Sequence, residues 1–351
     1  MKNVVGEVLL ISSSMSSWGF DVDRYLAYIS HITDLKEDLL RSLEFVEWKN
    51  QIEKGSTVFV KPNFTYPYYK EGITTNPELL RNLLEILKDR AGDVIVGESN
   101  GGNNSFTADN AFSGHDMYSI CREAGVNLVN LSKMPSVPVE DTIQGTKVKV
   151  LLPKLLLNEI DCFISVPVLK VHVMTTVTLS IKNLWGCYPD TMRCLHHQHL
   201  SRKLTLITKM LNPKLVVIDG IYALNGHGPM YGEAKKTNIL ISSNNPVVAD
   251  SLGTAVMGIP LKNVESILMA SNEGLGITDL SKVKMNDDWK KFSMDFQVKR
   301  TLVDNLSSLL FNSEILAKIV MCSPFTPIAY GLVKYLRNPQ EQTVVDELKN
   351  R

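Results

Sequence analysis

The sequence predicts an α/β protein with doubly wound, mostly parallel sheets in two lobes, a crevice between the lobes and a C-terminal helical extension. Two observations predict this fold class. Short apolar runs rich in β-branched residues recur along the chain, as in strands that are covered on both faces of a sheet. Helical patterns alternate with these runs, and such alternation is typical of parallel sheets.

The expected strands follow one another from the N-terminus to about residue 241. They are the runs 8–11, 58–60, 94–96, 128–129, 163–166, 215–218 and 239–241. Each run is apolar without in–out alternation, so we expect buried parallel strands. Apolar and charged residues alternate over 147–150 instead, which predicts an edge or hairpin strand.

Two of the expected helices have proline at the start and glycine at the end. Pro77 opens a helix that ends near Gly92, and Pro246 opens a helix that ends at Gly258. A stiff, turn-prone stretch, 134–138, lies between the two helices and predicts a lobe boundary near residue 135. We therefore expect an N-terminal lobe over 1–135, a second lobe over 136–290 and an extension over 291–351.

The extension carries apolar residues at helical spacing from Leu302 to Val320, which predicts a pair of amphipathic helices. The simpler interpretation is that these helices pack on the body or on a second subunit of a homodimer. The alternative is peripheral membrane contact through Lys318, Lys334 and Arg337.

Composition excludes several classes of protein. Lysine plus arginine and aspartate plus glutamate number 37 each, so the chain lacks the basic excess of a nucleic-acid-binding protein. The five cysteines are scattered and form no Cys-x-x-Cys pair, so we expect neither disulfides nor an iron–sulfur cluster in this chain alone. The N-terminus does not read as a signal peptide and no run reaches membrane-spanning length, so we expect a cytoplasmic protein.

Polar residues crowd the segment that follows the strand 163–166. Lys170 and His172 come directly after the strand, at the edge of the sheet where α/β proteins bind ligands. If the threonines at 175–176 start a helix, Thr178 and Lys182 lie on one face of it. The free N–H groups at such a helix start would favour a phosphate or a carboxylate.

Lys182 is the sharpest candidate for a catalytic residue, because its neighbours in the sequence include Leu184 and Trp185. Desolvation would lower the pKa of an amine in such surroundings and make it a usable base or nucleophile. Lys182 could instead be a surface lysine with a buried stem, and His172 a hydrogen-bonded loop residue.

Three further positions could carry chemistry. His196, His197 and His199 lie close together, and we assign His199 a catalytic role, with a solvated loop or a structural zinc site as alternatives. Asp219 follows the strand 215–218 and would point into the crevice. His227 lies between two glycines that would let the backbone approach a ligand, although an ordinary glycine-rich turn has the same pattern.

The first lobe contributes residues to the same crevice edge. Lys61 and Asn63 follow the strand 58–60, and Glu98 and Ser99 follow the strand 94–96. The glycines of 97–102 could cradle a phosphate, but the stretch matches neither the Walker nor the Gly-x-Gly-x-x-Gly pattern, so it is a weak nucleotide signature.

These motifs, in this order, closely resemble the domain-of-unknown-function family 362 over roughly residues 55–260. The motifs are Lys61-Pro62-Asn63, Thr74-Thr75-Asn76-Pro77, Gly97-Glu98-Ser99, Leu169-Lys170-Val171-His172, 177–186 with Thr178, Lys182 and Asn183, Val217-Ile218-Asp219-Gly220, Gly226-His227-Gly228-Pro229 and Ala249-Asp250. The resemblance implies ligand-binding roles for Thr75 and Asn183 as well. Many members carry an added ferredoxin-like cysteine module, which this sequence does not show.

A second resemblance is to lactate racemase and its relatives. His172 and Lys182 look like the counterparts of a histidine and of the lysine that tethers a nickel pincer cofactor, and 61–77 takes the place of a substrate-binding loop. This chain has Leu179-Ser180-Ile181 where those enzymes have paired glycines.

Two hypotheses about function follow. The first is an enzyme of the isomerase or redox type that acts on a small anionic molecule, with Lys182 and His172 as base, anchor or cofactor tether and with Asp219 and His199 assisting. The second is a non-catalytic ligand-binding or redox-partner module related to iron–sulfur proteins, and the missing cysteine module favours it.

Overall fold

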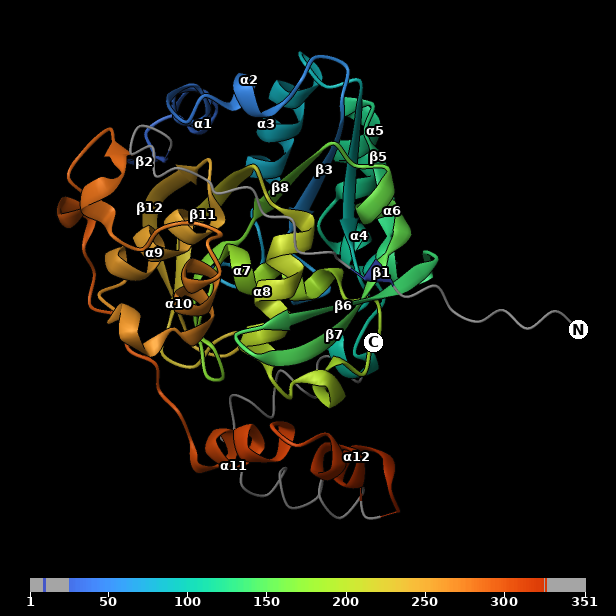
Figure 1. The fold of residues 1–351 in the computed structure, drawn as a ribbon. Helices are drawn as coiled ribbons and strands as arrows, with labels where there is room; N and C mark the ends of the chain where they lie inside the picture. Colours follow the sequence, from blue (N-terminus) through green and yellow to red (C-terminus); the bar gives the residue numbers. More distant parts are fainter. Residues whose placement is uncertain (1–8, 11–24, 325, 327–351) are drawn as a thin grey trace, which may run out of the picture.

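A ten-stranded sheet forms the centre of the molecule in the computed structural model, which describes residues 9–10, 25–324 and 326 (Figure 1). Its main path runs in the order β13 (Lys284–Met285), β2 (Leu26–His31), β12 (Glu233–Ser243), β11 (Leu215–Asn225), β8 (Cys162–Val166), β3 (Thr57–Pro62), β4 (Asp93–Glu98) and β5 (Asn127–Asn130). Beside this path, β9 (Val168–His172) pairs with β11 and β10 (Thr176–Thr178) pairs with β9.

The sheet is mostly parallel, which confirms the predicted fold class. Neighbouring strands from β5 through β4, β3 and β8 to β11 are all parallel. The prediction of a parallel strand at 239–241 was wrong, because β12 runs antiparallel to both β11 and β2. Only the short loop 226–232 separates β11 from β12, whereas a parallel neighbour needs a crossover of a dozen residues or more.

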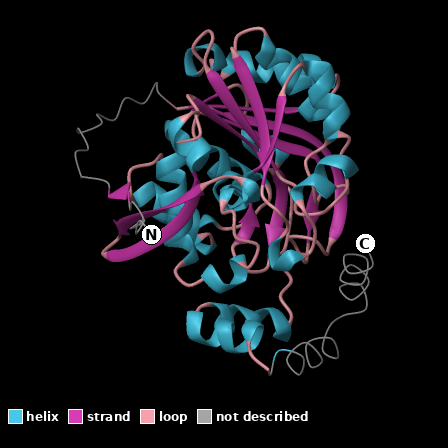
Figure 2. Cartoon of the chain, turned by 90° about the vertical axis from the view of Figure 1, so that its right-hand side faces the viewer, coloured by secondary structure: helices cyan, strands magenta, loops and turns pink. Residues whose placement is uncertain are grey.

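Helices cover both faces of the sheet, as a doubly wound fold requires (Figure 2). One face carries α1 (Leu35–Phe45), α2 (Trp48–Gln51), α3 (Pro77–Lys88), α4 (Ala108–Gly114) and α5 (Met117–Ala124), which share one apolar core. The other face carries α6 (Lys154–Asn158), α7 (Ser180–Asn183), α8 (Leu200–Leu211), α9 (Pro246–Val256) and α10 (Glu265–Asn272) over a second core.

The two proline-led helices form as predicted, and each starts behind an asparagine cap. The Asn76 side chain accepts hydrogen bonds from Glu78 N and Leu79 N at the start of α3, and Asn245 does the same at the start of α9. These contacts satisfy N–H groups that have no partner within the helix. Each proline therefore lies in the first turn of its helix, and the asparagine cap fixes the end of the loop in front of it.

A small second sheet lies beside the main one and joins β1 (Leu9–Leu10), β6 (Ser136–Ile143) and β7 (Thr146–Pro153). The hairpin of β6 and β7 confirms the hairpin strand predicted at 147–150. Leu9–Leu10, the described part of the strand expected at 8–11, pairs with β6 and so lies outside the main sheet. Strands from both sides of residue 135 share the ten-stranded sheet through the pairing of β3 with β8, and the division into three domains stays a prediction.

The expected pair of C-terminal helices is present as α11 (Leu302–Phe311) and α12 (Glu314–Cys322), which lie against one end of the body (Figure 1). Both contact the 3₁₀ turn Arg193–His196, while Leu302, Leu309 and Ile315 are at least 70% exposed. Within the described part of the chain, no helix combines the length and the apolar character needed to cross a bilayer.

Candidate functional site

The site is built around a buried ion pair at the carboxyl ends of two neighbouring strands. Lys61 at the end of β3 is fully buried, and its amine contacts the carboxylate of Glu98 at the end of β4 and donates to Pro62 O at 2.7 Å. Glu98 also accepts from Ser99 N at 3.0 Å. A Cβ at Gly186 would lie 2.5 Å from Glu98 Oε1, so glycine is needed where this turn crosses the pair.

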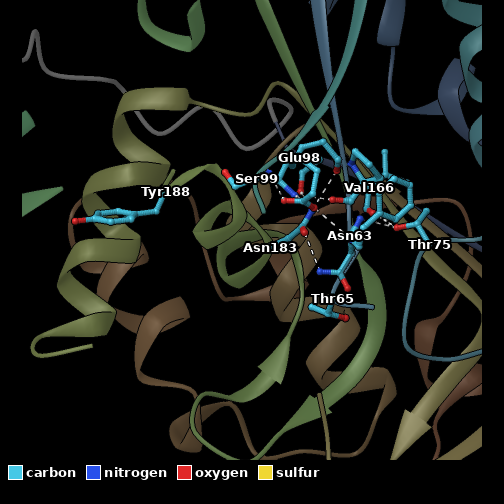
Figure 3. Close-up of polar contacts among 12 residues, drawn as sticks. Asn63, Thr65, Thr75, Glu98, Ser99, Val166, Asn183 and Tyr188 are labelled. Carbon is cyan, nitrogen blue, oxygen red and sulfur yellow. Dashed lines mark hydrogen bonds and ion pairs between the residues drawn. The ribbon is translucent and has the colours of Figure 1, made fainter. Parts of the chain in front are cut away.

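An amide network joins this ion pair to the polar segment 169–186, which we call the signature segment (Figure 3). Asn183 on α7 donates to Lys61 O at 3.2 Å and accepts from the Asn63 side chain at 2.9 Å. Thr75 accepts from Asn63 N and donates to Val166 O, both at 2.8 Å. The structure therefore brings together the predicted residues Lys61, Asn63, Thr75, Glu98, Ser99 and Asn183.

Lys170 lies in the same network without a carboxylate partner. Its fully buried amine donates to Asn63 Oδ1 at 2.6 Å, to Thr65 Oγ1 at 2.9 Å and to Ile73 O at 2.6 Å. Burial, followed by the charge of Lys182, holds the pKa of Lys170 well below its usual value. Three neutral acceptors thus hold an amine that the surroundings disfavour as a cation.

Lys182 on α7 is the candidate with the fewest contacts. Among the described residues, its amine has no hydrogen-bond or ion-pair partner, although the side chain lies deep in the protein and keeps partial exposure. Burial, together with the charges of Arg193 and Lys61, lowers the pKa of Lys182 to about 7. The sequence-based expectation of a lysine with a lowered pKa agrees with this environment.

Arg193 completes a group that we call the cationic cluster: Lys61, Lys170, Lys182 and Arg193. The guanidinium donates to Asn100 O at 2.6 Å and to Tyr188 O at 3.0 Å, both neutral acceptors. Burial lowers the pKa of Arg193, and Glu98 opposes this shift. No signal in the sequence singled out Arg193, because it lies in a loop between motifs.

His172 lies on the same face of β9 as Lys170, since the two are two residues apart on one strand. Its Nδ1 accepts from Met174 N at 3.0 Å and from Thr175 N at 3.4 Å, so the neutral ring carries its proton on Nε2. Burial, followed by the charge of Lys182, holds the pKa of His172 well below its usual value. His172 is therefore a neutral donor near Lys182, and no hydrogen bond joins the two side chains.

The helix expected at 175–176 begins later, and its free N–H groups are already occupied. Thr176 and Thr178 lie on β10, where Thr178 pairs with Lys170 in register. Helix α7 starts at Ser180, and Asp250 accepts from Ser180 N at 2.7 Å and from Ile181 N at 2.8 Å. The acceptor at this helix start is thus the protein's own carboxyl group, whose pKa burial raises to about 8.

Among the clustered histidines, the structure places His197 rather than His199 near Lys182. The charge of Lys182 adds to burial in lowering the pKa of His197 to about 3, and the His197 ring lies 5.9 Å from that of Trp185. His199 is exposed, with a left-handed backbone in front of α8. Sequence spacing could not separate the two, because a turn rather than a regular helix orients them.

Asp219 and His227 lie outside the cationic cluster. Asp219 accepts from Asn76 N at 2.7 Å and from Ile221 N at 3.0 Å, so it anchors the start of α3, and burial raises its pKa to about 6. His227 pairs with Asp304 on α11 at 3.1 Å. Neither residue is among the charges that shift the pKa of Lys182.

A polar cavity of about 450 Å³ lies on the α8 and α11 side of the site, with His197 in its wall. Thr175, His199 and Arg202 also line it, and Ser308 of α11 closes one side. Within the described ranges, no three histidine, cysteine, aspartate or glutamate side chains are grouped to hold a metal ion. The cavity, with its polar lining, is a candidate entrance for a ligand.

Comparison with known proteins gives few relatives. A Synechocystis sp. protein named "Thylakoid-associated protein sll1697" is 24% identical over 237 residues, which cover 65% of this chain and 70% of that protein. A Thermotoga maritima crystal structure matches 52% of this chain and 49% of its own at 10% identity, with a TM-score of 0.32.

The family comparison covers the whole site. The model of the family "Domain of unknown function (DUF362)" matches residues 58–255, more than half of the chain. The matched range begins at the strand that carries Lys61 and ends in the helix that carries Asp250. On this match, with the ordered motifs and the geometry they form, the chain belongs to the DUF362 family.

Proposed function

We propose that the protein is an enzyme that binds a small anionic molecule at the cationic cluster and uses Lys182 as a base or nucleophile. The observation that carries the proposal is the amine of Lys182, which has no partner among the described residues and has a pKa of about 7. Near neutral pH such an amine can accept a proton or attack an electrophilic carbon.

Charge balance supports an anionic ligand. Besides burial, the charge of Lys182 lowers the pKa of Lys170, and the charges of Arg193 and Lys61 lower the pKa of Lys182. Glu98 is a carboxylate that opposes the shifts of Lys170 and Arg193. A bound anion would offset the positive excess and raise the pKa of the lysines again. Burying cations without compensating anions is costly in free energy. An excess of buried positive charge is therefore typical of a binding site rather than of a structural core.

His172 would assist as a hydrogen-bond donor. Its Nδ1 accepts backbone N–H groups, so the Nε2 proton is available to a ligand oxygen. A neutral donor and a neutral amine suit proton transfer at a carbon next to a carbonyl group, and redox chemistry at the same carbon is compatible with them. We propose an isomerase-type or redox-type reaction on these grounds.

A tethered nickel cofactor is a variant of this proposal. The resemblance to lactate racemase assigns the tether to Lys182 and a contact to His172, and the unpartnered amine and neutral ring fit those roles. Such a group would supply a redox-active metal centre. Nickel analysis of protein from a nickel-supplied host, with the mass of the peptide that carries Lys182, tests this variant.

A second candidate function is a non-catalytic ligand-binding or redox-partner module. It rests on the family resemblance, because many members carry a ferredoxin-like cysteine module that this sequence does not show. Anaerobic purification with metal analysis and an absorption spectrum separates the functions. A chromophore or metal favours the enzyme, and a colourless, metal-free protein that binds anions without turnover favours the module.

The direct test of the proposal is the reactivity of Lys182 with an acylating reagent, followed by peptide mass spectrometry between pH 6 and 10. We expect the acylation of Lys182 to reach half its limiting rate near pH 7, and we expect inorganic phosphate or succinate to slow it. Lys36, which is 59% exposed and paired with Glu85, is the internal control. An ordinary lysine profile at Lys182 would remove the basis of the proposal.

A further inference from the structure

Two side chains in the wall of the cavity of about 450 Å³ each carry a buried nitrogen atom that has no hydrogen-bond partner among the described residues. The atoms are Arg202 Nε and His197 Nδ1. Arg202, the third residue of α8, has no ion-pair partner among the described residues. A guanidinium that lines a cavity and has no partner among the described residues is available to an anionic ligand, so Arg202 is the candidate binding residue of this cavity.

The charge of the lining favours a monoanionic ligand group. Among the residues that line the cavity, Arg202 carries the one permanent positive charge and Glu265 is the one carboxylate. Glu265 is occupied by Ser201, whose hydroxyl donates to it at 2.6 Å, and not by Arg202. A carboxylate matches a single guanidinium in charge and in bidentate geometry, whereas a dianionic phosphate would add a second negative charge to a lining that already holds Glu265.

His197 connects this cavity to the cationic cluster. It lines the cavity, and the charge of Lys182 lowers its pKa, so the two sites are neighbours. A molecule bound in the cavity could therefore extend past the His197 ring toward the amine of Lys182. Polar side chains on several sides, from Thr175 on the β9–β10 turn to Ser308 on α11, would enclose the rest of it.

We propose that Arg202 binds a carboxylate of the substrate, and that this substrate is a small carboxylic acid whose reacting carbon lies on the Lys182 side of His197. This inference rests on the proposed function for the role of Lys182, but the carboxylate site itself does not. Arg202 is thus a specificity-determining residue, on the helix that follows the signature segment.

The test is protection of Arg202 from phenylglyoxal, followed by peptide mass spectrometry, with acetate, succinate and inorganic phosphate compared at constant ionic strength. We expect succinate and acetate to slow the modification of Arg202 at least threefold and phosphate to have a weaker effect. Arg41, which is 54% exposed and paired with Asp38, should react at an unchanged rate. Equal protection by phosphate, or no protection by any anion, would overturn the carboxylate assignment.

Variants separate this inference from the proposed function. Calorimetric titration with succinate should show binding that Arg202→Gln weakens at least tenfold and that Arg202→Lys restores only in part. Lys182→Met should leave the protection of Arg202 in place. Loss of protection in Lys182→Met would contradict an independent Arg202 site, whereas an ordinary acylation profile at Lys182 with protection intact at Arg202 would contradict the enzyme proposal alone.

Discussion

Lys182 illustrates how one side chain can be destabilising for the fold and useful for chemistry. The side chain lies deep in the protein, and the charges that shift the pKa of its amine are the cations Arg193 and Lys61 rather than a carboxylate. The protein therefore holds a lysine whose protonated form is disfavoured. Burial is the larger cause of the lowered pKa, and the charges of Arg193 and Lys61 add to it.

Replacing Lys182 by methionine should stabilise the protein at low pH. The folded-state pKa of about 7 lies below the usual 10.5, so the wild type gains stability as the pH rises from 7 to 10.5 and carries the full penalty below 7. One pKa unit corresponds to about 1.4 kcal/mol, and partial exposure reduces the effect, so we expect a gain on the order of 1 to 2 kcal/mol at pH 6.

Urea denaturation at pH 6, 8 and 9.5 measures this gain, which should shrink as the pH rises. Lys36→Met, at an exposed and paired lysine, is the control and should give no gain at pH 6. Parallel curves for the wild type and Lys182→Met would contradict the lowered pKa.

Breaking the ion pair of Lys61 and Glu98 should destabilise the protein, in contrast to the replacement of Lys182. Glu98→Gln leaves the fully buried amine of Lys61 without its carboxylate, and breaking one side of a buried pair costs about 3 to 5 kcal/mol. The double variant Lys61→Met with Glu98→Gln should recover part of this loss in urea denaturation. A single-variant loss below about 1 kcal/mol would mean that Glu98 does not hold Lys61.

At the scale of elements, the short helix α7 depends on a residue far away in the sequence. Asp250 on α9 accepts both free N–H groups at the start of α7, and α7 carries Lys182 and Asn183. The sequence predicted a helix that starts at Pro246 and a polar segment around Lys182, but it did not predict the contact between Asp250 and the start of α7. A helix of one turn has little stability of its own, so tertiary hydrogen bonds decide where it starts.

Asp250→Ala should therefore lower the free energy of unfolding by about 2 kcal/mol at pH 5, because two buried N–H groups lose their acceptor. The raised pKa of about 8 means that the folded state keeps a proton on Asp250, so the wild type loses stability as the pH rises from about 4 through 8. Denaturation curves should show that the difference in the free energy of unfolding between the wild type and Asp250→Asn shrinks over that pH interval.

The two variants of Asp250 also report on the position of Lys182, which α7 carries. Asp250→Asn keeps one oxygen acceptor and should leave the acylation profile of Lys182 closer to that of the wild type than Asp250→Ala does. If both variants left the profile of Lys182 unchanged, α7 would not depend on Asp250.

Elements with local signals were predictable, and those that depend on partners were not. The asparagine and proline before α3, and the apolar runs of β3, β4 and β8, carry their signal in a few adjacent residues. The hairpin of β9 and β10 was missed, because it is a fully buried pair in which polar residues such as Lys170 and Thr178 face each other. Which histidine faces Lys182 was unpredictable for the same reason.

At the scale of the whole molecule, exposed apolar side chains concentrate on the last described helices. Leu302, Leu306, Leu309, Ile315, Leu316 and Ile319 are exposed there, and Leu40 and Tyr118 are the other large exposed apolar residues of the described chain. The inner sides of the two helices contact the body at the turn 193–196. A stripe of this kind is typical of a surface that another molecule covers.

We expect this stripe to join two copies of the chain. Sedimentation velocity should show a dimer that dissociates on dilution, and Leu309→Glu with Ile315→Glu should give monomers with an unchanged melting temperature for the body. Vesicles of anionic lipid should not pellet the wild-type protein. A monomer at all concentrations that pellets with vesicles would favour the membrane alternative.

The pairing of β2 with β12 has a consequence for how the protein is made. Ile29 pairs with Ile241, so the sheet joins two strands that lie more than 200 residues apart in the sequence. Pairings of such high contact order slow folding, and translation delivers the N-terminal partner first. The strands that carry Lys61, Glu98 and Lys170 leave the ribosome well before β12, and until it arrives β2 and β11 keep unpaired edges that invite aggregation.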